Sequence, residues 1–242
     1  MSGRGALQGQ VAIVTGAGRG IGHAVALALA REAATVVLAA RTRQQLAETA
    51  AAIRESGGTA LAIPTDVTQD AAVEAMVEQA IAALGRVDTL VTAAGAASFG
   101  PVVGTKPADW DAILAVNLRA VMVCCRAVLP IMIRQRRGTI INVASIAAQR
   151  AIPGAAVYTA TKAGVVGFSR VLAEELRADG VRVGVLVPGA VDTPLWATIP
   201  NSPDRTRMLR PEDVARAAVL MASLPQGASL EELILLPQGG VL

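Results

Sequence analysis

The sequence is poor in several residue types, and each scarcity excludes a class of protein. Its 242 residues include only two cysteines and one histidine. Cys124 and Cys125 are adjacent within an apolar stretch, a spacing that excludes a C-x-x-C metal site and a long disulfide loop, so we expect two buried thiols. His23 has no second ligand near it in the sequence, and we expect it to lie on the helix surface or to pack rather than to bind a metal. The sequence therefore predicts no metal site.

Aromatic residues and lysines are also scarce. There are two lysines, Lys106 and Lys162, and Tyr158 is the sole tyrosine. The formal net charge is +3, and the 20 arginines are scattered, with their densest cluster at 134–137. Because two Phe and two Trp spread far apart in the sequence supply no stacking platform, we expect no nucleic-acid partner and interpret the arginine cluster as a solvated helix end.

Long hydrophobic runs are missing as well. The most apolar stretch, 112–133, is interrupted by Asn117, Arg119, Arg126 and Pro130. No continuous apolar segment near the amino terminus has the form of a signal peptide. We therefore expect a soluble, cytoplasmic protein with no membrane partner.

What the sequence does contain is a regular alternation of short β-branched runs and longer alanine-rich helical patterns. Strands that are apolar on both faces and separated by helices indicate a parallel sheet that is covered on each side. The expected strands are 11–15, 35–39, 59–63, 88–91, 139–143, 181–187 and 233–236, and the expected helices are 20–33, 43–56, 70–84, 108–135, 155–179 and 211–223. We predict one doubly wound α/β domain over 1–242, with seven parallel strands and helices on both faces. The long irregular segment 188–210 is expected to be functional.

A glycine-rich turn follows the first expected strand directly. It reads Thr15-Gly16-Ala17-Gly18-Arg19-Gly20-Ile21-Gly22 and leads into a helical pattern. Glycines allow a sharp turn, bring backbone N–H groups close to a pyrophosphate and place its charge at a helix amino terminus. Lying between a strand and a helix, this turn indicates a Rossmann-type dinucleotide site.

The end of the second expected strand carries a cation where NAD-dependent enzymes need an acid. A carboxylate there binds the free 2′-hydroxyl of NAD, whereas this chain has Arg41. A guanidinium attracts the 2′-phosphate of NADP, and Arg19 in the glycine turn is a second candidate for the same group. The sequence therefore favours NADP over NAD.

A set of three residues in the second half of the chain has the chemistry of proton transfer. Tyr158 and Lys162 are four apart on an expected helix and so share one face. A neighbouring ammonium lowers the pKa of a phenol, and we therefore expect Tyr158 to act as a general acid/base with a lowered pKa. Ser145, after the fifth strand, can donate a hydrogen bond to an oxygen that becomes negative.

Together these features resemble the short-chain dehydrogenase/reductase family over essentially the whole chain. The matching elements are the 15–22 turn, Asp66-Val67, Ala94-Gly95, Asn117, Ser145, Tyr158-Thr-Ala-Thr-Lys162, and Pro188-Gly189 followed by Thr193. The resemblance implies that Tyr158 exchanges the proton, Lys162 also holds the nicotinamide ribose, Ser145 orients the substrate oxygen and Asn117 holds a proton-relaying water. The implied catalytic set is Asn117, Ser145, Tyr158 and Lys162. The expected cofactor set is Thr15, Gly16, Gly18, Arg19, Gly20, Ile21, Gly22, Arg41, Asp66, Val67, Ala94, Gly95, Tyr158, Lys162, Pro188, Gly189, Val191 and Thr193.

Two departures from the family pattern stand out. Thr92-Ala93 replaces the usual Asn-Asn before Ala94-Gly95, and we expect the loss of hydrogen bonds that brace the central sheet. The tail 231–240 differs from the usual ending of carrier-protein ketoreductases and is closer to the hydroxy-acid and small-carbonyl branch.

The function that we expect is NADP(H)-dependent hydride transfer between the nicotinamide and a carbonyl or secondary alcohol. The segment 188–210 is expected to bind the substrate in a mainly apolar pocket. Expected substrate contacts are Ala96, Ala97, Phe99, Ala147, Arg150, Ile152, Leu195 and Trp196. One alternative is a 3-oxoacyl-(acyl-carrier-protein) reductase, and another is an NADP-binding sensor or scaffold without turnover. The resemblance also implies a homotetramer or homodimer in which the helices 108–135 and 155–179 pair across a two-fold axis.

Overall fold

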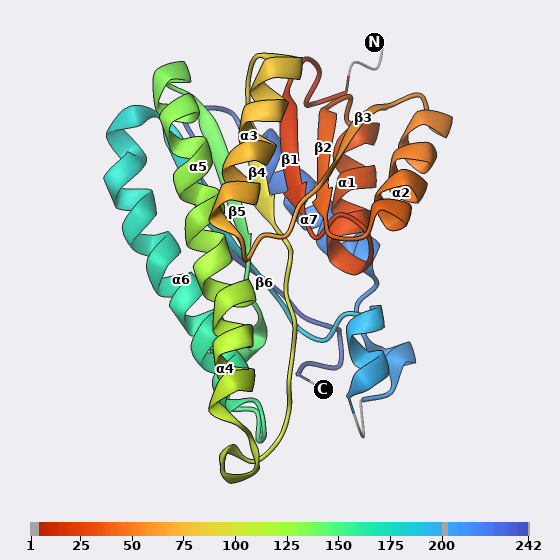
Figure 1. The fold of residues 1–242 in the computed structure, drawn as a ribbon, viewed down its shortest axis with the longest axis vertical. Coiled ribbons are helices and arrows are strands. Elements are labelled where there is room, and N and C mark those ends of the chain that lie inside the picture. Colours follow the sequence, from red (N-terminus) through yellow and green to blue (C-terminus); the bar gives the residue numbers. More distant parts are fainter. Residues whose placement is uncertain (1–4, 200–202, 242) are drawn as a thin grey trace.

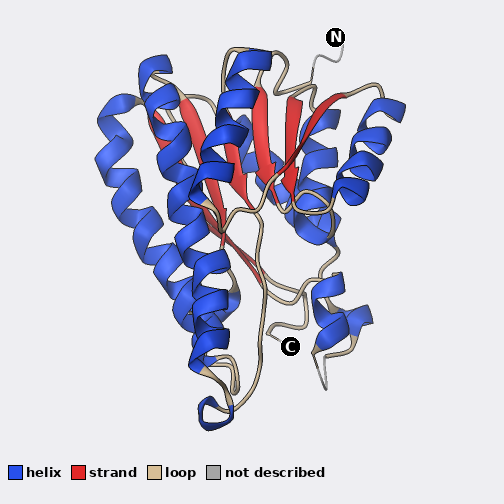
Figure 2. Cartoon of the chain, viewed as in Figure 1, coloured by secondary structure: helices blue, strands red, loops and turns tan. Residues whose placement is uncertain are grey.

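The computed structural model describes residues 5–199 and 203–241, and these residues contain a seven-stranded parallel sheet (Figure 2). Its strands are β1 Val11–Thr15, β2 Thr35–Ala40, β3 Thr59–Pro64, β4 Thr89–Thr92, β5 Gly138–Val143, β6 Val181–Pro188 and β7 Glu232–Leu235. The spatial order is β3-β2-β1-β4-β5-β6-β7, and every neighbouring pair is parallel. The order reverses between β1 and β4, the point at which ligands bind in open α/β sheets. The predicted fold class is confirmed.

Helices cover both faces of the sheet, as the apolar strands require (Figure 1). They are α1 Gly20–Arg31, α2 Arg43–Glu55, α3 Asp70–Leu84, α4 Pro107–Leu114, α5 Ala120–Gln135, α6 Ala156–Leu176 and α7 Pro211–Ser223. The core is correspondingly divided in two. Val11 and Ile13 of β1 pack with α3, α5 and α6, whereas Ala12 and Val14 pack with α1, α2 and α7.

The region expected to form a single helix over 108–135 contains a change of helical type. Between α4 and α5, residues Ala115–Arg119 form a π turn, which carries one extra residue relative to a regular α-helical turn. The buried Asn117 lies in its middle. The prediction of one uninterrupted α-helix was wrong at this point, because the apolar pattern runs through the π turn without a break.

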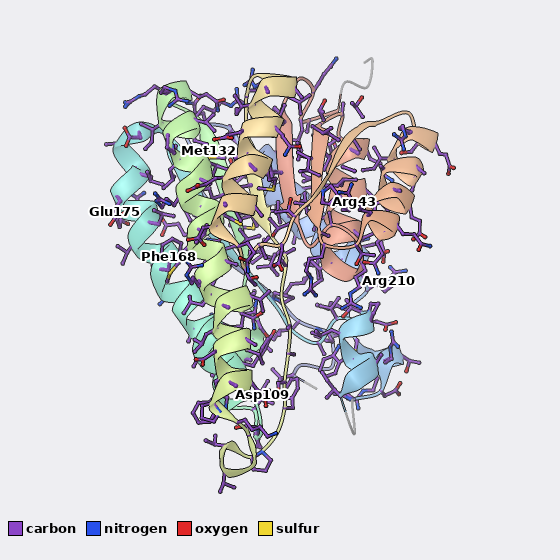
Figure 3. All side chains as sticks on the ribbon, in the orientation of Figure 1. Arg43, Asp109, Met132, Phe168, Glu175 and Arg210 are labelled. Atoms are coloured by element: carbon purple, nitrogen blue, oxygen red, sulfur yellow. The ribbon has the colours of Figure 1, made fainter. Side chains whose placement is uncertain are left out.

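By length and composition alone, the α4–α5 segment Pro107–Gln135 could cross a membrane. This is weak evidence, because the core helix of a soluble protein passes the same test. In the structure Val121, Cys125 and Val128 are buried in the half of the core that lies between the sheet and helices α3, α5 and α6. Figure 3 places Met132 and Asp109 at opposite ends of this segment, and Met132 is buried while Asp109 is exposed. Cys124 is buried like its neighbour, as predicted.

The segment 188–210 is irregular but partly ordered by local turns. It contains the 3-10 helices η5, Pro194–Thr198, and η6, Arg205–Arg207. Val191 and Leu209 form an isolated parallel bridge that brings the two ends of the segment together. These turns lie below the carboxyl ends of the strands in Figure 1. Residues 200–202, including Pro200, lie outside the described part of the chain.

Candidate active site

The glycine-rich turn joins β1 to α1 and has the shape expected of a phosphate cradle. Gly16 and Gly20 have positive φ values of +68° and +57°, which side chains other than glycine rarely adopt. A Cβ on Gly22 would lie 2.3 Å from the carbonyl oxygen of Gly16, so only glycine fits there. The buried Thr49 of α2 donates a hydrogen bond to the Ala17 carbonyl and fixes the turn from behind.

A cleft of about 800 Å³ runs along the carboxyl ends of the strands from this turn. It is large enough for a dinucleotide, and it is lined by most of the residues that the sequence assigned to the cofactor. Those in the lining are Gly16, Gly18, Arg19, Gly20, Ile21, Arg41, Asp66, Val67, Ala94, Gly95, Tyr158, Lys162 and Thr193. Those outside the lining are Thr15, Gly22, Pro188, Gly189 and Val191.

The residues outside the lining lie behind it. Thr15 is buried, and its hydroxyl accepts a hydrogen bond from the Ala94 amide. Gly189 packs against Pro237, and the carbonyl of the buried Val191 accepts a hydrogen bond from the indole of Trp196. Their observed contacts therefore support the walls of the cleft.

One end of the cleft is cationic. Arg19 and Arg41 are exposed there, and neither forms an ion pair with any residue in the described ranges. Asp66 lies nearby and accepts hydrogen bonds from the backbone and hydroxyl of Thr68. These bonds, with a smaller contribution from Arg41, hold the pKa of Asp66 below its ordinary value. This end therefore offers two unneutralised guanidinium groups to an anionic ligand.

Tyr158, Lys162 and Ser145 come together at the other end of the cleft. The Lys162 ammonium is buried, 5.9 Å from the centroid of the Tyr158 ring, and donates a 2.9 Å hydrogen bond to the Val143 carbonyl. Ser145 follows β5 and lies near enough to Tyr158 to lower the pKa of its hydroxyl. The serine oxygen also accepts a 3.2 Å hydrogen bond from the backbone N–H of Ala147.

The pKa values in this group differ from the expectation. Burial raises the pKa of Tyr158, and the hydrogen bond with Ser145 opposes that rise. Burial also lowers the pKa of Lys162 to about 8. The expectation of a lowered tyrosine pKa was wrong for the protein alone, because removal from water disfavours the charged form of both groups.

Asn117 connects three elements through its amide group. Its Oδ1 accepts a 2.9 Å hydrogen bond from the Ala96 N–H, and its Nδ2 donates to the Ala96 carbonyl at 2.8 Å. The same nitrogen donates to the Thr161 hydroxyl on α6. A Cβ on Gly95 would lie 3.2 Å from Oδ1 of Asn117 and 3.9 Å from Nζ of Lys162. The π turn thus holds the loop after β4 close to Lys162.

The replacement at Thr92-Ala93 does not leave the central sheet without polar bracing. Thr92 on β4 donates a 2.8 Å hydrogen bond to Oδ1 of Asn142 on β5, and Nδ2 of Asn142 donates to the hydroxyl of Ser169 on α6. All three residues are buried. The expected loss of bracing was therefore wrong, because a shorter hydroxyl reaches the asparagine of the neighbouring strand.

The residues expected to contact substrate are only partly brought together. Leu195 lines the cleft, as does Ala96, whereas Ala97, Ala147, Arg150, Ile152 and Trp196 lie outside its lining. Ala147 is buried, and Arg150 is exposed. Phe99 and Trp196 stack with ring centroids 6.2 Å apart, and Phe99 also lies 6.0 Å from the Tyr158 ring.

Several residues in the cleft lining were missed from the sequence. They are Ala40, Thr42, Gln45, Thr65, Thr68, Ala93, Ala112, Ile113, Ala115, Val116, Val143, Ala144 and Pro194. Many immediately follow or precede predicted positions, so the rule that ligands bind at the carboxyl ends of strands would have found them. Gln45, Ala112 and Ile113 lie within helices and carry no comparable signal.

His23 and the arginine cluster lie apart from the cleft lining. His23 is partly buried, and Nδ1 shares a 2.8 Å hydrogen bond with the Thr49 hydroxyl. Burial lowers its pKa, with a smaller opposing effect of Glu212. Of the two roles expected of it, a place on the helix surface or packing, the structure shows packing against Thr49. No group of three or more metal-binding side chains occurs within the described ranges.

A glycine turn at a sheet switch point, a cleft along the strand ends and a tyrosine–lysine–serine group define a dinucleotide-dependent enzyme. Comparison with known proteins identifies its family, since the short chain dehydrogenase model matches residues 10–204. The chain is 34% identical over 225 residues to a 3-oxoacyl-(acyl-carrier-protein) reductase of Thermotoga maritima, covering 90% of this chain and 92% of that protein.

Solved structures agree. A metagenomic short-chain oxidoreductase in complex with NADP has a TM-score of 0.86 and 38% identity, covering 96% of this chain and 99% of that one. An alcohol dehydrogenase from the archaeon Thermococcus sibiricus, complexed with 5-hydroxy-NADP, has a TM-score of 0.86 and 32% identity, covering 93% and 95%. The chain belongs to the short-chain dehydrogenase/reductase family and is an oxidoreductase that uses a nicotinamide dinucleotide.

Proposed function

We propose that this protein is an NADP(H)-dependent carbonyl reductase, or equivalently a secondary-alcohol dehydrogenase, and that residues 1–242 form one catalytic domain. The observation that carries the proposal is the position of Tyr158 and Lys162 at one end of a cleft whose other end carries Arg19 and Arg41. The glycine turn and the cleft volume fit a dinucleotide. When bound, the reduced nicotinamide supplies the hydride that the carbonyl carbon accepts.

The chain's own residues supply the proton and stabilise the developing charge. The Tyr158 hydroxyl donates its proton to the carbonyl oxygen in reduction and removes it in oxidation. Ser145, which lies beside Tyr158, orients the substrate oxygen. A phenol is protonated at neutral pH, which is the form that reduction needs, and burial raises the pKa of Tyr158 further. The Lys162 ammonium lies 5.9 Å from the centroid of the Tyr158 ring. Asn117 holds the loop at Ala96, and we assign it a proton-relaying water.

Tyr158→Phe tests the catalytic assignment. It removes only the hydroxyl, so we expect NADPH binding to persist while turnover of carbonyls falls at least about 100-fold. Fluorescence titration with NADPH and absorbance assays over a carbonyl panel measure the two effects. Unchanged turnover would refute the proton-donor role. An enzyme that binds NADPH but turns over no carbonyl or alcohol in its parent form would instead be the sensor or scaffold.

Arg41 carries the preference for NADP in this proposal. Arg41→Ala is expected to lower kcat/KM for NADPH about 10-fold or more and to leave kcat/KM for NADH nearly unchanged, because only NADPH presents the 2′-phosphate. Arg43→Ala is the matched control, since Arg43 is an exposed neighbour outside the cleft lining. A clear preference of the parent enzyme for NADH would contradict the assignment.

The second candidate substrate is a 3-oxoacyl thioester on a carrier protein, which the Thermotoga relative's name favours. An assay that compares an acetoacetyl thioester with simple ketones separates the two. We assign substrate binding to the segment 188–210, of which Thr193, Pro194 and Leu195 line the cleft.

We further propose a cytoplasmic homodimer or homotetramer without a membrane or nucleic-acid partner, paired through α5 and α6. Met122 on α5 and Val171 on α6 are exposed apolar residues, and small residues such as Gly167 on α6 allow helices to approach closely. Sedimentation at micromolar concentration tests this assembly, and a stable monomer would contradict it.

A further inference from the structure

The aromatic residues of this chain are few, and most of them lie in one place. Of two Phe, two Trp and one Tyr, three form a row in which Phe99 lies between Tyr158 and Trp196. The Phe99 and Tyr158 rings are inclined by 37°, and the Phe99 and Trp196 rings are nearly parallel at 21°. The row therefore begins at the residue assigned to proton transfer.

Hydrogen bonds hold Trp196 and the loop that carries Phe99. The Trp196 indole N–H donates a 2.8 Å hydrogen bond to the Val191 carbonyl, which leaves the ring faces free of polar partners. Phe99 precedes Gly100, whose N–H donates a 2.8 Å bond to the Gly154 carbonyl near the start of α6. These bonds join Trp196 to the segment that follows β6, and the Phe99 loop to the turn that precedes α6.

The rings remain available to a ligand, since Phe99, Tyr158 and Trp196 are each only partly buried. The neighbouring parts of the cleft are apolar as well, with Ala96 and Leu195 in the lining. At this end of the cleft, Lys162 is the one charged side chain among the described lining residues, and its ammonium donates a hydrogen bond to the Val143 carbonyl. A substituent held here therefore meets π faces and hydrocarbon.

We propose that Phe99 and Trp196 form a specificity-determining subsite for a planar aromatic group on the carbonyl carbon of the substrate. This inference rests on the proposed carbonyl reduction and names its substrate class. Aromatic rings bind one another in offset and inclined arrangements, with ring quadrupoles that a saturated ring of the same size lacks. An aryl ketone can place its oxygen at Tyr158 and its ring against Phe99, because the two residues are in contact.

Acetophenone and cyclohexyl methyl ketone provide the test, since they differ chiefly in a planar aromatic versus a saturated ring. In Phe99→Leu, which keeps an apolar side chain, we expect kcat/KM for acetophenone to fall roughly tenfold and kcat/KM for the cyclohexyl ketone to change less than about twofold. Phe99→Tyr keeps the ring and is expected to restore acetophenone reduction. Val103→Ala, in the same loop but 97% exposed, is the matched control.

Melting temperature and NADPH affinity report whether each variant is folded. Trp196→Leu gives a second, independent measurement, in which we again expect kcat/KM to fall more for acetophenone than for the cyclohexyl ketone. Equal losses for the two ketones, or failure of Phe99→Tyr to restore the aryl ketone, would overturn the subsite. Reduction of other carbonyls with neither ketone accepted by the parent would overturn it too. If no carbonyl oxidises NADPH at all, the proposed function itself fails.

Discussion

Lys162 is a buried ammonium whose charge costs stability, and replacing it should make the protein more stable at neutral pH. The side chain is 6% exposed and forms no ion pair within the described residues. Burial lowers its pKa from 10.5 to about 8, a difference that corresponds to about 3 kcal/mol. Lys162→Met removes this cost but leaves the Val143 carbonyl without its donor, which costs about 1 kcal/mol.

The sign of the pH dependence follows from proton binding. Between pH 8 and 10.5 the unfolded chain keeps the lysine proton while the folded protein has lost it, so the free energy of unfolding of the parent rises with pH in that window. Lys162→Met lacks this rise. We expect the variant to be more stable by about 2 kcal/mol at pH 7.5 and the advantage to shrink as the pH approaches 10.

Urea unfolding of both proteins at several pH values between 7.5 and 10 measures the effect. The buried thiols Cys124 and Cys125 also contribute to pH dependence in this range, but both proteins contain them and their effect cancels. Lys106→Met, at the exposed second lysine, should show a pH-independent difference from the parent. A difference for Lys162→Met that stays constant over the range would refute the reasoning.

Two further predictions concern the frame of the site. Thr92→Val leaves Oδ1 of the buried Asn142 without its hydroxyl donor. We expect the free energy of unfolding to fall by about 1–2 kcal/mol and Tm, measured by calorimetry, to fall by about 3–6 °C. Thr59→Val, at an exposed position on the edge strand β3, is the control and should change Tm by less than about 1 °C. Gly22→Ala places a Cβ against the Gly16 carbonyl and distorts the glycine turn, so we expect NADPH binding in a fluorescence titration to weaken at least about tenfold. Gly227→Ala, with open space around its Cβ, is the control and should leave the affinity unchanged. Equal affinities of the two variants would contradict the assignment of the glycine turn to phosphate binding.

The sheet was predictable because its signals are local. The run 11–15 is apolar throughout, and β1 has the same bounds in the structure. At β4 and β7 the observed strands are displaced by one residue from the predicted 88–91 and 233–236, since the polar residues at their ends carry little register information. Helix α3 has its predicted bounds and is followed by Gly85, which has positive φ. Helix α6 ends at Leu176, three residues before the predicted 179, and a 3-10 turn leads from it to Gly180.

The candidate site was predictable only where a motif spans neighbouring residues. Spacing places Tyr158 and Lys162 on one face, but it does not give the depth of burial or the direction of the ammonium, and these determine the pKa values. The contact of Phe99 with Trp196 joins segments far apart in the sequence, so no local pattern indicates it. Thr92 was misjudged because its partner, Asn142, lies on another strand.

The orientation of α4 relative to α5 depends on the number of residues in the π turn at Ala115–Arg119. A regular α-helix turns by about 100° and rises about 1.5 Å per residue. Deleting one residue here would restore an unbroken α-helix and rotate everything before it by that angle, which would carry Ile113 out of the cleft wall. Relatives that lack the extra residue would thus need a different set of side chains on α4 to close the same cleft.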